Sequence, residues 1–212
     1  MTVKEKVIYH IFADRGVESE ALRPHGEVIR IGLDPTDEND SYPIKADANE
    51  LPLRKGADLA VLHPPCARFS RVTWLSGDSE DHPNLIPLAR KLGEKYASEY
   101  IIENVPRAPL EDPVILDGRM FGIPLQYRRA FECSFPVDTI PCQSRFGNQE
   151  VSPMHGGDRS KLWWAATKGY RGDRYTKQAI VRNAVPSAYI HHLMRAYHRA
   201  TNETDSQEAR LF

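Results

Sequence analysis

The sequence has few cysteines and no long apolar run. Its three cysteines, Cys66, Cys133 and Cys142, are an odd number without the spacing of metal ligands, which argues against a disulfide framework and against a zinc site. No apolar stretch approaches the roughly 18 residues that a membrane-spanning helix needs, and residues 1–6 lead into a strand-like segment instead of a secretory leader. We therefore expect a cytoplasmic protein with no bound metal and no membrane segment.

The sequence also lacks the basic surplus that is typical of nucleic-acid-binding proteins. Its formal net charge is -1, from 28 lysines and arginines against 29 aspartates and glutamates. Such a balance restricts any nucleic-acid contact to local clusters of charge. Lys and Arg alternate with Tyr and Trp in two segments, 119–129 and 159–174, although any one of these charges is equally well explained as solvated surface.

Apolar strand-like runs alternate with helical periodicity through the first half of the chain. We expect strands at residues 6–12, 27–33, 57–62 and 100–102, and helices at 18–22 and 86–96. A chain of 212 residues is long enough for one well-packed domain. Because strands and helices alternate, the predicted fold class is α/β, with a doubly wound, mostly parallel sheet.

The sequence divides into four parts on the same criteria. Residues 1–135 are the predicted α/β core, which ends in a strand-like run at 131–135 that makes Cys133 a core residue. Residues 136–175 are rich in Gly, polar and aromatic side chains and predict a small irregular lobe. Residues 176–200 are helical after Pro186 and are expected to return to the core, and 201–212 are polar and are expected to form a flexible tail.

Cys66 is the cysteine with a chemical setting. Taken alone, a cysteine is more often a small buried hydrophobe than a nucleophile. Here, however, Pro64 and Pro65 stiffen the chain after a predicted buried strand, and the polar segment 70–81 could fold over a substrate. The sequence therefore predicts a nucleophile at the sheet edge with a lid beside it.

Glu103 follows its own predicted strand and has no obvious structural reason to be there, although a lone glutamate is often just a surface residue. Ligands of such sheets collect beyond the carboxyl ends of the strands, where Phe12, Asp34, Cys66 and Glu103 would all lie. A thiolate next to an acid suits addition to an electron-poor pyrimidine: the thiolate attacks carbon 6, the acid hydrogen-bonds N3, and carbon 5 becomes nucleophilic.

These motifs resemble those of a known family. Pro64-Pro65-Cys66 with Phe69-Ser70, followed by Glu103-Asn104-Val105, resembles the catalytic motifs of the DNA (cytosine-5)-methyltransferases in order and spacing. The stretch 103–131 is similar to the compact members of this family that phages carry. The resemblance implies a Rossmann-like S-adenosylmethionine-dependent methyltransferase fold, with residues 136–175 as a reduced target-recognition lobe. It also implies Cys66 and Glu103 as catalytic residues acting on a cytosine flipped out of double-stranded DNA.

The same resemblance assigns a site for the cofactor, S-adenosyl-L-methionine. The implied cofactor-binding residues are Phe12, Ala13, Gly16, Asp34, Asp47, Pro64, Asn183 and Val185, of which Asp47 is similar to the acid that contacts adenine and Asn183 and Val185 belong to the motif that closes the pocket. The glycine-rich turn of the family is replaced by Asp14-Arg15-Gly16-Val17-Glu18, which leaves one glycine where backbone amides approach the cofactor.

Assignments on the DNA side are less specific. The Gln-x-Arg-x-Arg pattern of the family is out of register here, so either Arg128 or Arg129 could polarise the target base. The candidates for DNA contact are Ser70, Arg145, Arg159, Lys161, Arg171 and Arg174. A lobe this short can place few side chains against base edges, so we predict a recognition sequence of about two or three base pairs read by a monomer.

Alternatives remain open at this point. The same core could act on cytosine in RNA, or the chain could be a catalytically silent nucleic-acid-binding relative, although a binding module needs neither Cys66 nor Glu103. His191, His192 and His198 lack metal-ligand partners and are expected to be solvated or packed. Trp163 and Trp164 could stack on bases or anchor the lobe in the core. The resemblance places the protein in a prokaryotic or phage-infected cell.

Overall fold

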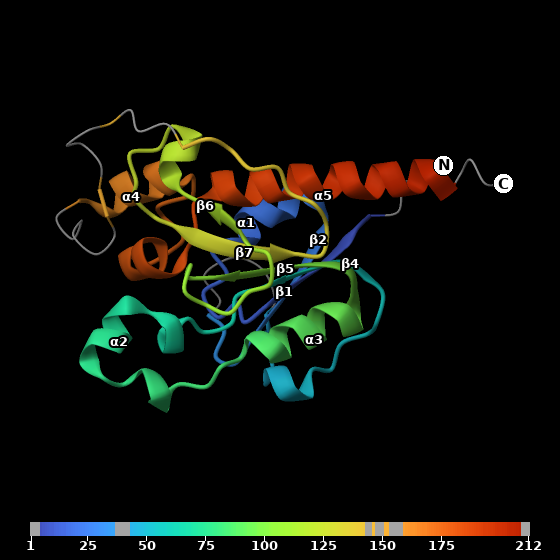
Figure 1. The fold of residues 1–212 in the computed structure, drawn as a ribbon, viewed down its shortest axis with the longest axis horizontal. Helices are drawn as coiled ribbons and strands as arrows, with labels where there is room; N and C mark the ends of the chain where they lie inside the picture. The colour runs from blue at the N-terminus through green and yellow to red at the C-terminus, as the bar shows by residue number, and fades with distance from the viewer. Residues whose placement is uncertain (1–4, 37–42, 143–145, 147–150, 153–158, 209–212) are drawn as a thin grey trace.

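The computed structural model describes residues 5–36, 43–142, 146, 151–152 and 159–208, apart from the side chains of Val72 and of residues 203–208. These residues form one mostly parallel sheet with helices on both faces (Figure 1). The predicted α/β class is therefore confirmed.

The sheet has seven strands in the order β3-β2-β1-β4-β5-β7-β6. They are β1 (Val7–Ile11), β2 (Glu27–Gly32), β3 (Ile44–Lys45), β4 (Ala57–Leu62), β5 (Ala97–Asn104), β6 (Val114–Leu116) and β7 (Arg129–Cys133). The first five are parallel to one another, β7 runs antiparallel to β5, and β6 runs antiparallel to β7 and so in the same direction as the first five. The chain builds outward from β1 in one direction and from β4 in the other, so the strand order reverses between these two strands. Ligands of open α/β sheets bind at the carboxyl ends of the strands at such a reversal.

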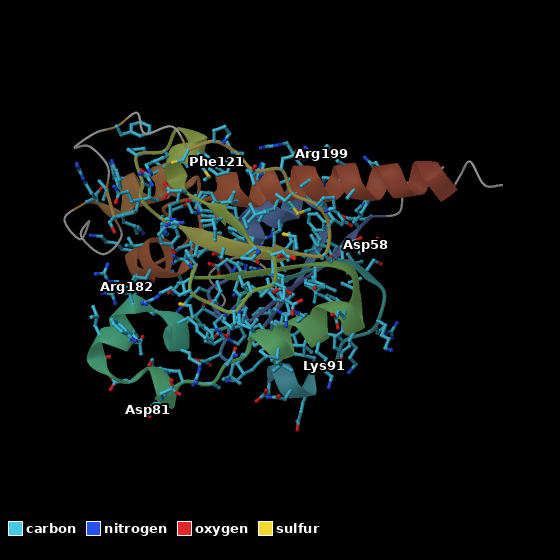
Figure 2. The ribbon with its side chains drawn as sticks, viewed as in Figure 1. Asp58, Asp81, Lys91, Phe121, Arg182 and Arg199 are labelled. Atoms are coloured by element: carbon cyan, nitrogen blue, oxygen red, sulfur yellow. The ribbon has the colours of Figure 1, made fainter. Side chains whose placement is uncertain are left out.

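Helices cover both faces of the sheet, because successive apolar side chains of a strand point to opposite faces and each face must be buried. In β4, Leu59 and Val61 belong to the core under α5 (Ser187–Glu208), whereas Ala60 and Leu62 belong to the core under α3 (Ile86–Tyr96). The short helix α1 (Ser19–Leu22) lies on the α5 side. Figure 2 shows the same division, with Phe121 on the α5 side of the sheet and Lys91 on the α3 side.

Most expected elements are present. The limits of β1, β2 and α1 differ from the expected ones by no more than one residue at either end, and those of three other elements differ by more. The predicted bounds of β4 and α3 are confirmed residue for residue. Strand β5 is longer than expected, beginning at Ala97 directly after α3, because its ladder to β4 and the hydrogen bonds between Tyr100 and Ser134 support its polar amino end. β7 begins two residues earlier than the predicted run and ends at Cys133. The last helix was expected to end near Ala200 and continues to Glu208.

The segment expected to be an irregular lobe contains a helix that joins the main core. Helix α4 (Lys161–Lys168) is capped at its start by Ser160, whose side chain accepts from the backbone N–H of Trp163 at 3.1 Å, and at its end by Gly169 in the left-handed conformation. Trp164 is fully buried in the same cluster as α5. Of the two roles considered for Trp164, core anchor is therefore correct and base stacking is wrong.

A buried lysine supports the turn that follows. Lys168 is 1% exposed, and its Nζ donates to the carbonyls of Ile180, Val181 and Ala184 at 2.8, 3.0 and 2.5 Å. These carbonyls lie in or just after the π-helical turn η7 (Ala179–Asn183), and the widened π-helical pattern is rare and needs such support. An ammonium has three N–H donors, so the three carbonyls use its full capacity.

Candidate active site

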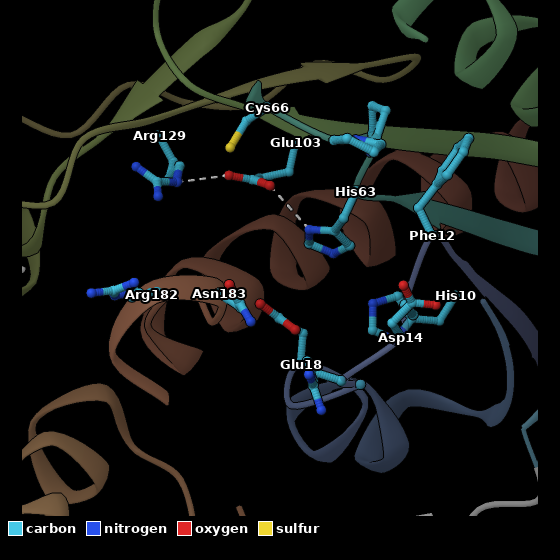
Figure 3. A pocket seen from close by; sticks show the side chains of 15 residues that line it. His10, Phe12, Asp14, Glu18, His63, Cys66, Glu103, Arg129, Arg182 and Asn183 are labelled. Carbon is cyan, nitrogen blue, oxygen red and sulfur yellow. Dashed lines mark hydrogen bonds and ion pairs between the residues drawn. The ribbon is translucent and has the colours of Figure 1, made fainter. Parts of the chain in front are cut away.

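A cavity of about 300 Å³ lies at the carboxyl ends of β1, β4 and β5, where the strand order reverses (Figure 3). Its walls come from the segments after these three strands, from the start of β7 and from η7. The lining residues are His10, Phe12, Ala13, Asp14, Arg15, Gly16, Glu18, His63, Pro64, Pro65, Cys66, Glu103, Arg129, Arg182 and Asn183. This volume is at the small end of the range for ligand pockets, which is about 300 to 1,000 Å³.

Cys66 stands where the chain leaves β4. Pro64 is buried and its carbonyl accepts a hydrogen bond from Asn104 Nδ2 at 2.9 Å, which fixes the two prolines against the end of β5. Cys66 then begins the short 3-10 turn Ala67–Phe69, with its carbonyl accepting from the N–H of Phe69 at 3.0 Å. The residue is exposed. Partial burial of its sulfur and the nearby charge of Glu103 raise the pKa of the thiol, so the resting side chain is protonated.

Glu103 is buried at the end of β5 and contacts two cationic side chains. Its Oε1 pairs with Arg129 Nε at 2.9 Å, and its Oε2 is 3.1 Å from His63 Nδ1. Burial alone would raise the pKa of this carboxyl. The hydrogen bond from His63 and the charge of Arg129 outweigh that effect and lower the pKa. Figure 3 shows Glu103 between the two cations, with the Cys66 sulfur directed to the same part of the cavity.

Strand register decides which of the two neighbouring arginines enters the cavity. Glu103 is paired with Phe131 in the antiparallel ladder, so the two side chains leave the sheet on the same face. Arg129 lies two residues before Phe131 and therefore shares that face, whereas Arg128 points away and is exposed. The Arg129 guanidinium also donates to the Tyr127 hydroxyl at 2.6 Å and lies 3.9 Å from the centre of its ring.

Two histidines of the cavity were not predicted from the sequence. His10 on β1 is fully buried, with its Nδ1 2.7 Å from Ser19 Oγ, and its ring meets that of His63 edge-on at 5.0 Å. The Nε2 atoms of both histidines are buried and, within the described part of the chain, have no hydrogen-bond partner. The sequence did carry a signal, since His63 directly precedes Pro64-Pro65-Cys66 and His10 precedes Phe12 by two positions in an apolar strand.

Most of the predicted cofactor-binding residues lie around the same cavity. Phe12, Ala13, Gly16, Pro64 and Asn183 line it. Phe12 has φ 60°, a left-handed backbone that a non-glycine residue adopts at some energetic cost and that is frequent at binding sites.

The motif that contains Val185 meets the first turn through a buried contact. Val185 does not line the cavity, but its backbone N–H donates to Glu18 Oε1 at 2.9 Å. That bond joins the first turn of the chain to its last motif. It also holds Glu18, a buried carboxylate that was not predicted as a site residue, in the cavity wall.

Asp34 and Asp47 lie outside this cavity. Asp34 is exposed after β2 and pairs with Lys45 Nζ at 3.1 Å. Asp47 follows β3 and caps the turn Ala48–Glu50, accepting from the N–H of Asn49 at 2.8 Å. Both residues are at the carboxyl edge of the sheet, beside the cavity and on its β2 side.

The glycine-poor first turn is tied to the end of β2 by polar contacts. Asp14 Oδ1 accepts from the N–H of Asp34 at 3.0 Å, and the Asp14 carbonyl accepts from the buried Arg30 at 3.0 Å. Gly32 lets Asp14 come this close, because a Cβ at Gly32 would stand 2.3 Å from Asp14 Oδ1. Asp14 therefore occupies the space beside Gly32 that a larger side chain would fill, and its hydrogen bonds connect the end of β1 to the end of β2.

The described candidates for DNA contact lie outside the cavity. Ser70, Arg159, Lys161, Arg171 and Arg174 are described and none of them lines the cavity, and Arg145 lies outside the described residues. Arg159 stacks on Trp163 at 5.3 Å, and the backbone N–H of Arg171 donates to Glu20 at 3.2 Å. The helix α2 (Arg71–Ser76), in the segment expected to act as a lid, exposes Trp74 and Leu75, which sequence reasoning had not singled out.

The histidines of the last helix are packed, as expected. His198 Nε2 is 3.0 Å from His25 Nδ1, and His192 Nε2 is 3.0 Å from the Asp138 carbonyl. Among the residues that the structure describes, no three His, Cys, Asp or Glu side chains are arranged to hold a metal ion. In the same part of the chain, no helix is both long and apolar enough to cross a bilayer.

Comparison with known proteins found similarity in structure but none in sequence. No protein-family model matches the sequence, and no curated protein matches it. The Entamoeba histolytica methyltransferase EhMeth has a TM-score of 0.59 at 10% identity, covering 92% of this chain and 98% of that chain. The S. pombe Dnmt2 methyltransferase has the same TM-score and identity, covering 93% and 99%.

A third structure is similar over a shorter stretch. It is a putative DNA modification methyltransferase encoded within an E. coli prophage, with a TM-score of 0.42 at 17% identity, covering 63% of this chain and 49% of that chain. With the sheet order, the two full-length likenesses show that this chain has a Rossmann-like α/β fold similar to that of these two methyltransferases.

Proposed function

We propose that this chain is a DNA (cytosine-5)-methyltransferase that uses S-adenosylmethionine as methyl donor and Cys66 as nucleophile. One observation carries the proposal: Cys66 lies at the end of β4 in the same cavity as Glu103, a buried carboxylate held by Arg129. A nucleophile beside an oriented acid suits addition to a pyrimidine. The fold, which is that of methyltransferases, supports the same reaction.

The cavity wall formed after β1 suits S-adenosylmethionine. Phe12 offers an aromatic face for the adenine, and the buried Glu18 carboxylate suits a cationic ligand group. Asn183, from the last motif, would close the site from η7. When bound, S-adenosylmethionine supplies an electrophilic methyl group for carbon 5 of the base.

The residues of the chain would then act in a fixed order. Cys66 Sγ attacks carbon 6 as its proton leaves to water, and Glu103 hydrogen-bonds N3, where charge develops. Arg129 holds Glu103 through Nε and keeps further N–H groups for the base, since a guanidinium has five donors. After carbon 5 loses its proton to water, the bond between sulfur and carbon 6 breaks and frees the base.

Methyl transfer to matched DNA and RNA tests the proposal. Purified protein is incubated with radiolabelled S-adenosylmethionine and with each nucleic acid, and the product is digested and analysed for 5-methylcytosine. We expect label in DNA. Label in RNA alone would replace the proposed substrate, and binding of nucleic acid without transfer to either would favour the silent relative.

Arg129 and Arg128 form a matched pair for mutation. We expect Arg129→Ala to lower kcat by about a hundredfold or more, because it removes a charge-assisted partner of the buried Glu103. Arg128→Ala should stay within about threefold of wild type in activity, because Arg128 is exposed and faces away from Glu103. Steady-state kinetics with DNA checks this, with thermal unfolding as the control for folding. Equal losses in the two variants would contradict the assignment.

The acidic residues beside the cavity are expected to contribute to cofactor affinity. In the proposed site, Asp34 and Asp47 contact the adenosine part of the cofactor, so Asp34→Ala and Asp47→Ala should each weaken binding about fivefold. Glu27→Ala is a suitable control, since Glu27 is an exposed carboxylate at the opposite end of β2 from Asp34. Calorimetric titration with S-adenosylmethionine measures all three variants. Unchanged affinity in both aspartate variants would place the cofactor elsewhere.

A further inference from the structure

The proposed reaction needs a proton that Glu103 does not hold at rest. N3 of the base must gain a proton or a strong hydrogen bond when Cys66 adds to carbon 6. Burial favours a protonated Glu103, but the hydrogen bond from His63 and the charge of Arg129 outweigh it and lower the pKa. The carboxyl therefore meets the base without a proton, and a neighbouring group must supply one.

His63 is in direct contact with the carboxylate. It follows β4, three residues before Cys66, and its Nδ1 is 3.1 Å from Glu103 Oε2. Its side chain is only 12% exposed, and the second carboxylate of the cavity, Glu18, adds to the negative charge around it. Burial alone would lower the pKa of His63. The hydrogen bond to Glu103 and the charge of Glu18 reverse the effect and raise the pKa above its ordinary value of 6.5.

The other charged groups that face His63 do not offer the same proton. Arg129 keeps its own proton and opposes the charging of His63. His10 meets the His63 ring edge-on, but burial, with the charges of His63 and Arg30, lowers the pKa of His10 well below its ordinary value. Because the two pKa values are shifted in opposite directions, His63 keeps its proton to a higher pH than His10 does.

Building on the proposed function, we propose that His63 is a positioning residue that stores the proton passed through Glu103 to N3 of the target base. On addition, the bond between sulfur and carbon 6 forms and the thiol proton goes to water. The His63 Nδ1–H bond breaks as Glu103 Oε2 takes that proton, and Glu103 gives a proton to N3. On release, carbon 5 loses its own proton to water, the bond between sulfur and carbon 6 breaks, N3 returns a proton through Glu103 to His63, and the Cys66 thiolate takes a proton back from water.

A His63→Asn variant distinguishes a role in storing the proton from a role in holding Glu103 in place. An asparagine amide can replace the Nδ1–H donor toward Glu103, but it does not titrate. We expect single-turnover methylation at pH 7 to slow about a hundredfold, as for a lost general acid, with little change in the affinities for DNA and S-adenosylmethionine. If support alone mattered, His63→Asn would keep a rate within a fewfold of wild type, and that result would overturn the inference.

The pH dependence gives a second readout. In the wild type, the logarithm of the single-turnover rate constant should rise with pH while His63 is charged, because more thiolate forms, and level off above the pKa of His63. In His63→Asn the rate constant should rise through that pH without a break until the Cys66 thiol titrates. His191→Asn, on α5 and outside the cavity, is the control and should keep the break. A break that persists in His63→Asn would assign it to another group and overturn the inference.

The stored proton can be observed without turnover. The chain has eight histidines, and in a sample with ¹³C-labelled histidine the signal missing from His63→Asn identifies His63. We expect His63 to titrate above pH 6.5 in the wild type and at lower pH in Glu103→Gln. A wild type in which His63 titrates at or below pH 6.5 overturns the inference even if methylation is normal. A wild type that methylates neither DNA nor RNA overturns the proposed function instead, and the transfer to N3 with it.

Discussion

Replacing Cys66 with alanine is expected to abolish methyl transfer and to leave the fold intact. The residue is exposed after the prolines, so its loss creates no cavity in either core cluster. Cys66→Ser should also be inactive at neutral pH, because a hydroxyl is far less nucleophilic than a thiolate. Transfer of labelled methyl groups to DNA measures both variants, and circular dichroism checks that they are folded.

Cys142→Ala is the matched control, since Cys142 is another exposed free cysteine and lies outside the cavity. DNA that contains 5-fluorocytosine adds a direct test of the covalent step. Carbon 5 then carries fluorine and cannot lose a proton, so wild type and Cys142→Ala should remain attached to the DNA and Cys66→Ala should not. Retained turnover in Cys66→Ala would remove this residue from the mechanism.

Lys168→Met is expected to lower the free energy of unfolding by about 3 kcal/mol or more. Burial lowers the pKa of Lys168, and hydrogen bonds from its Nζ to three carbonyls hold the side chain in the protein interior. Methionine fills similar space but leaves those carbonyls without a donor, and each unsatisfied buried acceptor costs about 1 to 3 kcal/mol. Urea denaturation followed by circular dichroism measures the loss.

Lys91→Met makes the same chemical change at an exposed position of α3, far from η7 (Figure 2). It should alter the free energy of unfolding by no more than about 0.5 kcal/mol. If Lys168→Met were as mild as Lys91→Met, the carbonyls of η7 would find other donors and the lysine would not be needed to hold Asn183 at the cavity.

Sequence periodicity predicted the elements whose buried side chains follow a regular pattern along the chain. β4 is a short run of apolar residues covered on both faces, and α3 buries one stripe, so each pattern specifies its own limits. β5 was underestimated because its amino end is polar and half-exposed and is kept in the sheet by its ladder to β4 and by Ser134, which follows β7. A pattern read along one segment contains no information about such neighbours.

The sequence predicted the site residues that belong to motifs, but not those whose position depends on the pairing of strands. Cys66 and Glu103 follow strands that the sequence identifies, and parallel strands bring their carboxyl ends to one edge. The choice between Arg128 and Arg129 depends on the register of β7 against β5, which no local pattern shows. His63 was overlooked for another reason: a single histidine after an apolar strand also fits a packed core residue, and only its contact with Glu103 indicates a role.

The hydrogen bond between Val185 and Glu18 spans 167 positions of sequence. During synthesis, the first turn therefore leaves the ribosome long before the residue that completes its hydrogen bonding. Until that partner arrives, the Glu18 carboxylate must remain hydrated, because burying it alone is too costly. Contacts between such distant segments slow folding, since a long loop must close before they form. A nascent chain thus completes the wall of this pocket only after the segment that contains Val185 has docked on the first turn.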